Sequence, residues 1–314
     1  MKKINIGIIG AGNHFKKNIL PVLNKFNNLN VKALLVNKSK KNIKNTNNIF
    51  NKKIFLNLDL DFIYISTPNM SHEEFIIDSL KNNIHVICEK PFLVSSKNFK
   101  KIKNLSKKNN LLIFEAFMYQ YHSLFNFIKD KIILDKKNKV KYIISNFRFP
   151  SIDKKNNRYN SKLGNGFFFD CACYLLSIEN FFFNKKTIYQ KTNFQYIKEN
   201  VLLRGNIFLK SKNISRYYFW GEGQRYTNDI EIFYDKGSIY VPYFFSKPKN
   251  KEIILEIYEN FKIKKKIFKY ENHFFNMFNV IFKNYKNKNF QKNQSNLIEK
   301  QIKLLEKILK LDKK

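Results

Sequence analysis

Short apolar runs alternate with amphipathic segments through the first third of the chain, and this alternation constrains the fold most. The apolar runs predict strands at residues 4–9, 31–36, 62–65, 85–88 and 111–114. Between them, in residues 16–26, 72–82 and 95–108, apolar side chains recur every three or four positions, which is the helical period. Repeated strand–helix–strand units predict a parallel sheet with helices on both faces.

The pattern changes at about residue 140, where strands follow one another through short turns. Strands are predicted at residues 140–149, 201–209, 214–220, 229–234, 238–243 and 252–258. Such short connections favour an antiparallel sheet. An amphipathic helix over residues 297–311 follows near the end. We therefore expect an α/β protein with a doubly wound parallel-sheet domain over residues 1–121 and an α/β domain with a large, mostly antiparallel sheet over residues 122–314.

The chain is strongly basic, with 59 Lys and Arg against 24 Asp and Glu and a net charge of +35. Such a charge raises the expectation of an anionic partner. Only five of the basic residues are Arg, however, and Lys is enriched together with Asn, Ile and Phe, which share A/T-rich codons. A protein selected to bind phosphates would favour the bidentate guanidinium of Arg. We attribute the charge mainly to coding bias and expect no specific nucleic-acid partner.

The apolar runs and the cysteines indicate in which cellular compartment the protein is expected. No apolar run reaches the ~18 residues of a membrane span. The basic first three residues and the apolar run after them resemble a signal peptide, but Asn5 interrupts the run and Lys16 and Lys17 follow too soon, so a buried strand fits better. The three cysteines, with Cys171 and Cys173 two residues apart, match neither a disulfide framework nor a zinc site. We expect a cytoplasmic protein without a metal or a membrane partner.

A glycine loop follows the first predicted strand. Its sequence, Gly10-Ala11-Gly12-Asn13-His14-Phe15, fits G-x-G-x-x-[G/A] except at Phe15. The first Gly allows a tight turn, and the second lets backbone N–H groups approach a pyrophosphate at the start of a helix. A plain strand–helix turn is the alternative. With a strand before it and a helix after it, the loop predicts dinucleotide binding by Gly10, Gly12, Asn13, His14 and Phe15.

The second predicted strand is followed by Asn37-Lys38-Ser39-Lys40 and by no carboxylate. Folds selective for NAD carry an acid there to bind the ribose 2′-hydroxyl. Lys38 would instead attract a 2′-phosphate, which favours NADP(H) over NAD(H). Because Lys is so common in this chain, any loop could contain one by chance.

Four further segments occur in a recognisable order. Thr67-Pro68-Asn69-Met70-Ser71-His72 and Glu89-Lys90-Pro91 each follow a predicted strand. Residues 115–122 read E-A-F-M-Y-Q-Y-H, and residues 164–174 read G-N-G-F-F-F-D-C-A-C-Y. Together with the Trp220-Gly221 segment, these motifs resemble the Gfo/Idh/MocA family of nicotinamide-dependent sugar and polyol oxidoreductases along the whole chain. The chain departs from the family pattern at Asn165 and Ala172. It also departs at residue 120, where Gln replaces the usual Arg.

The resemblance implies an N-terminal Rossmann-type domain and hydride transfer at a sugar carbon that bears a hydroxyl or ketone. Lys90 would then lie at the reacting oxygen, Tyr174 would give or take its proton, and Asp170 would bind a substrate hydroxyl or orient Lys90. Asp170 and Tyr174 are four residues apart and would share a helix face. From the residues alone, Asp170 could equally be a helix cap, Tyr174 a core aromatic and Lys90 a surface lysine.

Cofactor contacts are expected from the glycine loop and from the residues that follow the later strands, which are Lys38, Thr67, Pro68, Asn69, His72, Glu89 and Lys90. We expect an NADP(H)-preferring oxidoreductase that acts on a sugar or sugar nucleotide and forms a homo-oligomer through the open face of its second sheet, as often occurs in the family. An aldose 1-dehydrogenase of the same family is the close alternative. A non-catalytic dinucleotide-binding regulator and a nucleic-acid-binding protein are the alternatives from other classes.

Overall fold

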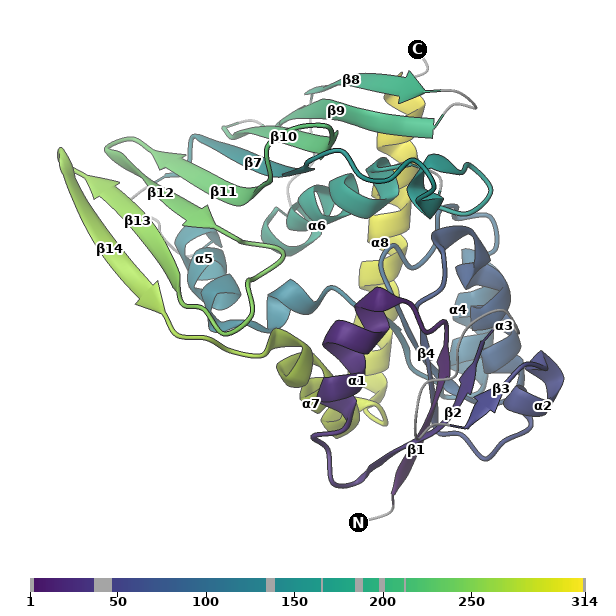
Figure 1. Cartoon of the computed structure of the whole chain (residues 1–314). Helices are drawn as coiled ribbons and strands as arrows, with labels where there is room; N and C mark the ends of the chain where they lie inside the picture. The colour runs from purple at the N-terminus through teal and green to yellow at the C-terminus, as the bar shows by residue number, and fades with distance from the viewer. Residues whose placement is uncertain are drawn as a thin grey trace. The chain divides into compact units, whose positions relative to one another are not determined.

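The computed structural model describes residues 3–36, 47–133, 139–164, 166–183, 189–197, 201–211 and 213–312. The chain forms two compact units (Figure 1). Unit 1 comprises Met1–Phe117 and Phe274–Lys303, and unit 2 comprises Met118–His273 and Leu304–Lys314. The expected domains, 1–121 and 122–314, stay a prediction. The compact units differ from them because a segment near the C-terminus returns to unit 1.

Unit 1 contains a six-stranded parallel sheet in the order β3-β2-β1-β4-β5-β6. The strands are β1 (Ile4–Ile9), β2 (Leu29–Leu35), β3 (Asn48–Ile49), β4 (Phe62–Ile65), β5 (His85–Cys88) and β6 (Ile113–Glu115). The order reverses between β1 and β4. In doubly wound sheets, ligands bind at the carboxyl ends of the strands beside such a switch point. The predicted parallel sheet is confirmed.

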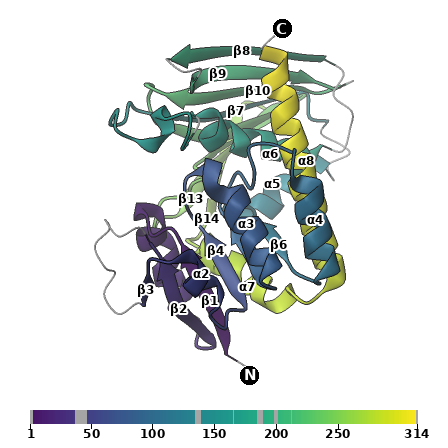
Figure 2. The ribbon, with the colours of Figure 1, turned by 90° about the vertical axis from the view of Figure 1, so that its right-hand side faces the viewer.

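Helices cover both faces of this sheet, because alternate side chains of its buried strands face opposite ways. Ile63 and Ile65 of β4 belong to a core that includes Ile76 of α3 (His72–Lys81), Ile102 of α4 (Phe99–Lys108) and Ile302 of α8 (Lys288–Asp312). Figure 2 shows α3 and α4 side by side.

The other face carries an aromatic cluster. Phe62 and Tyr64 of β4 contact Phe282 and Phe278 of α7 (His273–Asn284), with ring centroids 5.4 and 5.9 Å apart. The remaining helical segments of unit 1 are η1 (Phe15–Ile19), α1 (Leu20–Leu23), α2 (Lys52–Leu56) and η2 (Asn69–Ser71). A single helix over 16–26 was expected, but η1 is π-helical and a short α-helix follows it. Pro21 lacks the N–H that a regular helix would require at that position.

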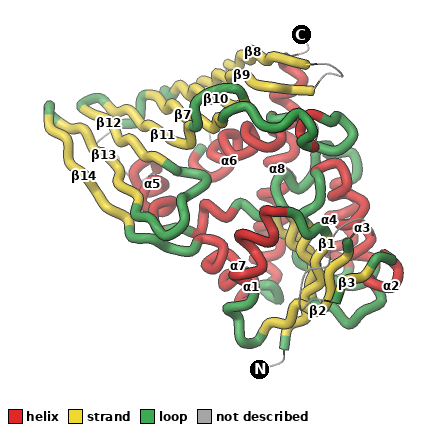
Figure 3. Tube along the Cα trace, viewed as in Figure 1, coloured by secondary structure: helices red, strands yellow, loops and turns green. Residues whose placement is uncertain are grey.

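Unit 2 contains an eight-stranded sheet in the order β14-β13-β12-β11-β7-β10-β9-β8, seen as one layer in Figure 3. The strands are β7 (Tyr142–Phe149), β8 (Tyr189–Ile197), β9 (Val201–Lys210), β10 (Ser215–Glu222), β11 (Thr227–Tyr234), β12 (Gly237–Pro242), β13 (Ile253–Glu259) and β14 (Lys262–Phe268). Only the central pair β7 and β10 is parallel, so the mostly antiparallel sheet is confirmed. The two edge strands, β8 and β14, were not predicted. The exposed strand β14 contains four lysines, so its sequence shows no regular alternation of apolar and polar residues.

The two faces of this sheet differ. Its inner face packs against α6 (Cys173–Phe182): Phe147 of β7 contacts the ring of Tyr174, with centroids 5.1 Å apart. The outer face carries Tyr142, Ile144, Tyr217 and Phe219, of which both tyrosines are exposed. The other helical segments of unit 2 are η3 (Met118–Tyr121), α5 (Ser123–Ile133), η4 (Asn157–Tyr159) and η5 (Phe168–Ala172).

Candidate functional site

The two glycines of the loop after β1 have different surroundings. Gly10 has a φ of +89°, and a Cβ there would lie 2.8 Å from the carbonyl oxygen of Ser66. The Ser66 hydroxyl donates to the carbonyl oxygen of Gly10 at 2.6 Å, which joins the ends of β1 and β4. A Cβ on Gly12 would meet no atom within 4 Å. Gly10 is therefore required by the turn, whereas Gly12 leaves open space beside the loop that a pyrophosphate could occupy.

Phe15 occupies the position where the motif expects a third small residue. Its side chain is fully buried and contacts the ring of Tyr64 at 6.4 Å between centroids. The π-helical turn that begins at Phe15 is wider than an α-helical turn. Asn13 and His14, which precede it, are exposed. Lys38, the predicted partner of a 2′-phosphate, lies outside the described residues.

Glu89 follows β5 and joins a cluster of polar side chains. Its carboxylate accepts a hydrogen bond from the Tyr64 hydroxyl and lies 3.2 Å from Nε2 of His14. Burial alone would raise the pKa of Glu89, but His14, Tyr64 and Lys90 together hold this pKa below its usual value. Glu89 therefore places a negative charge between the glycine loop and Lys90.

His72 links the loops that follow β4 and β5. Its side chain is fully buried, with Nδ1 2.9 Å from the carbonyl oxygen of Pro91 and Nε2 3.0 Å from that of Thr67. Burial lowers the pKa of His72, so the neutral ring donates one hydrogen bond. Beside it, the Ser71 hydroxyl donates to the carbonyl oxygen of Pro68 at 2.8 Å. Cofactor contacts by His72, Thr67, Pro68 and Asn69 stay predictions.

Glu115, at the end of β6, supports the segment that contains Lys90. Its carboxyl oxygen Oε1 accepts the backbone N–H of Phe92 at 2.8 Å. Burial raises the pKa of Glu115 to about 8, although the Phe92 N–H and Lys90 both favour the charged form. Glu115 belongs to the predicted motif of residues 115–122, but no role was predicted for it. The feature that could have identified Glu115 is an acidic residue directly after the apolar run of residues 111–114.

In unit 2, Asp170 lies in the π-helical segment η5, and Tyr174 lies in the first turn of α6. The carboxylate of Asp170 accepts Nε–H of Arg158 at 2.7 Å. Arg158 was not predicted as a site residue, although its being one of only five Arg in a Lys-rich chain could have pointed to it. The buried Tyr174 hydroxyl donates to Sδ of Met118 at 3.4 Å.

The predicted catalytic residues fall in different units. Lys90 belongs to unit 1, and Asp170 and Tyr174 belong to unit 2. Their common role in catalysis stays a prediction. Among the described residues, no group of His, Cys, Asp and Glu could hold a metal ion. Within the same ranges, no helix has the length and apolar character needed to span a bilayer.

Comparisons with known proteins agree with this geometry. Residues 4–117 match the Gfo/Idh/MocA family model, described as an oxidoreductase family with an NAD-binding Rossmann fold. The chain is 22% identical to a dTDP-3,4-didehydro-2,6-dideoxy-alpha-D-glucose 3-reductase of Saccharopolyspora spinosa over 201 residues. This alignment covers 63% of this chain and 60% of the reductase. Over 124 residues, it is 28% identical to an NADP⁺-dependent D-xylose 1-dehydrogenase of Haloferax volcanii, which covers 39% of this chain and 38% of that enzyme.

A solved structure matches over nearly the whole chain. KijD10, a 3-ketoreductase from Actinomadura kijaniata, has a structure as a tyrosine-to-phenylalanine variant in complex with TDP-benzene and NADP. It superposes with a TM-score of 0.89 at 17% identity and covers 98% of both chains. The fold is therefore shared along the chain, whereas the sequence match spans less than two thirds of the curated reductase. Residues 4–117 of the chain thus match the NAD-binding Rossmann domain of the Gfo/Idh/MocA oxidoreductases, and the rest of the chain shares the fold of KijD10.

Proposed function

We propose that this protein is an NADP(H)-preferring oxidoreductase that reduces a ketone, or oxidises the matching hydroxyl, of a sugar or sugar nucleotide. One observation carries the proposal. The loops after β1, β4 and β5 are joined in unit 1 by the contacts of Ser66 with Gly10, Glu89 with His14, and His72 with Thr67 and Pro91. This is the edge of a doubly wound sheet at which dinucleotides bind.

The residues of this edge fit the cofactor. The backbone at Gly12 would hold the pyrophosphate, with Asn13 and His14 beside it, and Lys38 would pair with a 2′-phosphate. Glu89 and Lys90 would lie toward the nicotinamide. A bound nicotinamide supplies or accepts the hydride. The preference for NADP(H) is supported by the complexes of KijD10 with NADP and by the NADP⁺-dependent xylose dehydrogenase.

The protein's own residues would manage the charge and proton on the substrate oxygen. The ammonium of Lys90 would donate a hydrogen bond to this oxygen as negative charge develops during reduction. The Tyr174 hydroxyl would give the oxygen its proton and take one back during oxidation. Asp170, held by Arg158, would accept a hydrogen bond from a neighbouring substrate hydroxyl.

Relatives support the substrate class. The dTDP-sugar 3-reductase and KijD10 favour a sugar-nucleotide ketone over an aldose. KijD10 has also been solved as a lysine-to-alanine variant in complex with TDP-benzene and NADP. Lysine and tyrosine, the residue types replaced in the two KijD10 variants, are also the types that we assign to the substrate oxygen here.

We also infer a cytoplasmic location, supported by three free cysteines. We further infer a homo-oligomer, supported by the exposed aromatic residues of the outer face.

Cofactor titration tests the proposal. Because a Cβ at Gly12 meets no protein atom, a Gly12→Val protein should fold normally while its side chain occupies the place of the pyrophosphate. NADPH fluorescence should show binding to the unmodified protein and little binding to Gly12→Val. Lys38→Asp should weaken NADPH by roughly ten- to a hundred-fold and NADH much less. Absent binding of both cofactors to the unmodified protein would refute the proposal; equal binding would refute only the NADP preference.

A further inference from the structure

Two exposed tyrosines lie next to each other at one end of the eight-stranded sheet. Tyr226 comes directly before β11 and Tyr243 directly after β12, and these two strands are antiparallel neighbours. Tyr226 is 42% exposed and Tyr243 is 41% exposed. Their ring centroids are 6.5 Å apart, and the planes of the rings are inclined by 29°. These two residues, the tyrosine pair, therefore present two roughly parallel rings at one place.

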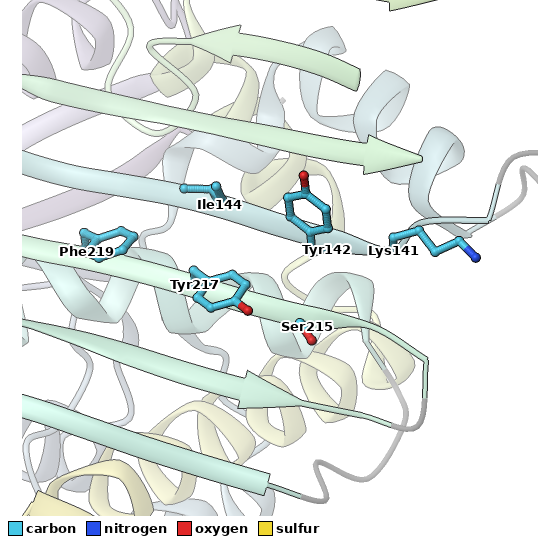
Figure 4. A pocket seen from close by; sticks show the side chains of 6 residues that line it. All are labelled: Lys141, Tyr142, Ile144, Ser215, Tyr217 and Phe219. Atoms are coloured by element: carbon cyan, nitrogen blue, oxygen red, sulfur yellow. The ribbon is translucent and has the colours of Figure 1, made fainter. Parts of the chain in front are cut away.

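Exposed tyrosines of the outer face differ from the tyrosine pair in how closely they stack. Tyr142 and Tyr217 project from one face of β7 and β10 (Figure 4). The ring centroid of Tyr142 lies 4.2 Å from that of Phe233, and the ring centroid of Tyr217 lies 4.9 Å from that of Phe208. The separation within the tyrosine pair is close to the upper limit of about 7 Å for rings that attract each other. The rings of the pair therefore gain little from one another and can accept a further flat ring.

The backbone at Tyr243 is in an unfavourable conformation. Its φ is +52°, in the left-handed region that bulky side chains rarely adopt. The next N–H, that of Phe244, donates to the carbonyl oxygen of Asn228 at 3.1 Å and so fixes the chain at this point. Strained residues that the surrounding structure holds in place cluster at ligand-binding sites. The strain at Tyr243 is therefore a reason to ask what its ring binds.

The side chain of Asn228 holds both members of the tyrosine pair. This side chain is buried, and its Oδ1 accepts the backbone N–H of Phe245 at 2.9 Å. Its Nδ2 donates to the carbonyl oxygen of Ser246 at 2.7 Å and to the hydroxyl oxygen of Tyr226 at 3.1 Å. One amide thus fixes Tyr226 by its hydroxyl and the segment after Tyr243 by its backbone. A ligand that stacks here would meet rings that are already ordered, which lowers the entropic cost of binding.

The same segment contacts the proposed proton donor. The ring of Phe245 lies 5.7 Å from the ring of Tyr174, between centroids, and Phe147 packs against both rings. The strand register places Asn228 directly opposite Phe147, so both side chains extend from the inner face of the sheet. Through Asn228, Tyr226 is therefore held on the side of the sheet where Tyr174 lies, and not on the outer face.

We propose that Tyr226 and Tyr243 form a subsite that stacks against the nucleobase of a sugar-nucleotide substrate whose sugar reaches Tyr174. The inference rests on the proposed function and deepens it, because it selects a sugar nucleotide over a free sugar. Every base has an aromatic face, so stacking on tyrosine rings accepts different bases. Since the Tyr226 hydroxyl accepts its hydrogen bond from Asn228, its own proton can be donated to a carbonyl oxygen of the base.

Mononucleotide binding tests the subsite without catalysis. The probes are thymidine, uridine and guanosine monophosphate, each compared with the sugar phosphate that lacks the base, deoxyribose 5-phosphate or ribose 5-phosphate. Saturation-transfer NMR on the full chain would measure the affinity and show which ligand protons contact the protein. We expect the base protons to receive the strongest transfer, and at least one nucleotide to bind about tenfold or more tightly than its base-free counterpart. Gly12→Val protein should give the same result, which separates the subsite from the cofactor loop.

Variants assign the binding to the tyrosine pair. Tyr226→Ala and Tyr243→Gly should each weaken nucleotide binding about tenfold and leave the base-free sugar phosphates unaffected. Glycine adopts a positive φ without strain, so the Tyr243→Gly protein should remain folded. Tyr226→Phe keeps the ring and loses only the hydroxyl, and should weaken binding by less than Tyr226→Ala. Tyr217→Ala, which removes a 38% exposed ring from the outer face, should leave the affinity unchanged.

Two results would overturn the subsite. The first is that no nucleotide binds more tightly than its base-free sugar phosphate. The second is an equal nucleotide affinity in Tyr226→Ala, Tyr243→Gly and the unmodified protein, which would place the base elsewhere. Neither result depends on NADPH binding or activity. Nucleotide binding that requires the tyrosine pair, in a protein that transfers no hydride to any carbohydrate, would support the subsite and refute the proposed function, so the two can fail separately.

Discussion

Two carboxylates with the same kinds of partner behave differently in the two units. Glu89 in unit 1 accepts a hydrogen bond from the Tyr64 hydroxyl and lies beside His14, and these partners lower the pKa of Glu89. Glu179 in unit 2 accepts hydrogen bonds from the Tyr218 hydroxyl at 2.5 Å and from Nε–H of Arg216 at 2.7 Å, yet burial raises the pKa of Glu179. The chemical groups are similar, and their surroundings decide the outcome.

The surroundings follow from where each carboxylate lies in the fold. Glu89 follows a parallel strand, at the edge where the loops of unit 1 meet, and its partner His14 is 41% exposed. Glu179 lies on a helix packed against a sheet, and its partner Arg216 is fully buried. A charged cluster at a strand end remains available to a ligand, whereas a charged cluster in a core serves packing and specificity.

The largest effects should separate chemistry from stability. If Lys90 and Tyr174 act on the substrate oxygen, Lys90→Ala and Tyr174→Phe should each lower turnover by about 10² to 10⁴ fold. NADPH affinity and the melting temperature should change little. Steady-state kinetics with fluorescence titration would measure both quantities. Turnover near that of the unmodified protein in both variants would show that these residues have other roles.

The core cluster should dominate stability. Arg216→Met leaves the Glu179 carboxylate buried without its cation, which should lower the free energy of unfolding by about 3–5 kcal/mol. The double variant Arg216→Met with Glu179→Leu should recover most of this loss, since no charge is then buried. Glu89→Gln, the matched change in unit 1, should cost less than about 1.5 kcal/mol. Urea denaturation would show whether the two clusters differ; equal losses would contradict the comparison.

The glycine loop allows a matched pair of substitutions. Gly10→Ala forces a Cβ into the Ser66 carbonyl at a positive φ, and should destabilise unit 1 by about 1–3 kcal/mol. Gly12→Ala adds the same atom in open space, and should leave stability within about 0.5 kcal/mol. Thermal melts would compare the two. A larger loss for Gly12→Ala would mean that the loop is shaped differently from this description.

A further effect concerns pH. The folded pKa of Glu115 is about 8, above its ordinary value of 4.5, so the folded protein holds a proton that the unfolded chain releases. Stability from this group is therefore complete below pH 4.5 and is lost as pH rises toward 8, by at most about 1.4 kcal/mol per pH unit. Glu115→Gln keeps an acceptor for Phe92 N–H without titrating.

Denaturation at several pH values checks this expectation. The variant should gain stability relative to the unmodified protein between pH 5 and pH 8 and show a constant difference above that range. A difference that stays the same from pH 5 to pH 8 would place the pKa of Glu115 near its ordinary value.

The parallel sheet of unit 1 could largely be predicted from sequence because its strands and most of its helices follow one another in residues 4–117. A parallel strand, its glycine loop and its helix follow one another along the chain, so the glycine loop was predicted from its position, whereas Glu89 was named from the family resemblance. The π-helical start at Phe15 was not predicted, because it depends on how a large side chain fits against Tyr64.

Unit 2 was predicted less completely because its contacts join distant segments. Arg158 and Asp170 form an ion pair across twelve residues of chain that no local pattern specifies. Likewise, the apolar stripe of residues 297–311 predicted a helix correctly but did not reveal that Ile298 and Ile302 belong to the core of unit 1.

Hydride transfer tests the central claim most directly. The protein would be mixed with sugar ketones and sugar nucleotides in the presence of NADPH that carries deuterium at its hydride-donating carbon, and the products would be examined by mass spectrometry. We expect one deuterium on the carbon of the reduced carbonyl of a sugar-nucleotide ketone, with one NADP⁺ formed per product and no transfer by Gly12→Val. Folded protein that binds NADPH yet transfers no deuterium to any carbohydrate would contradict the account.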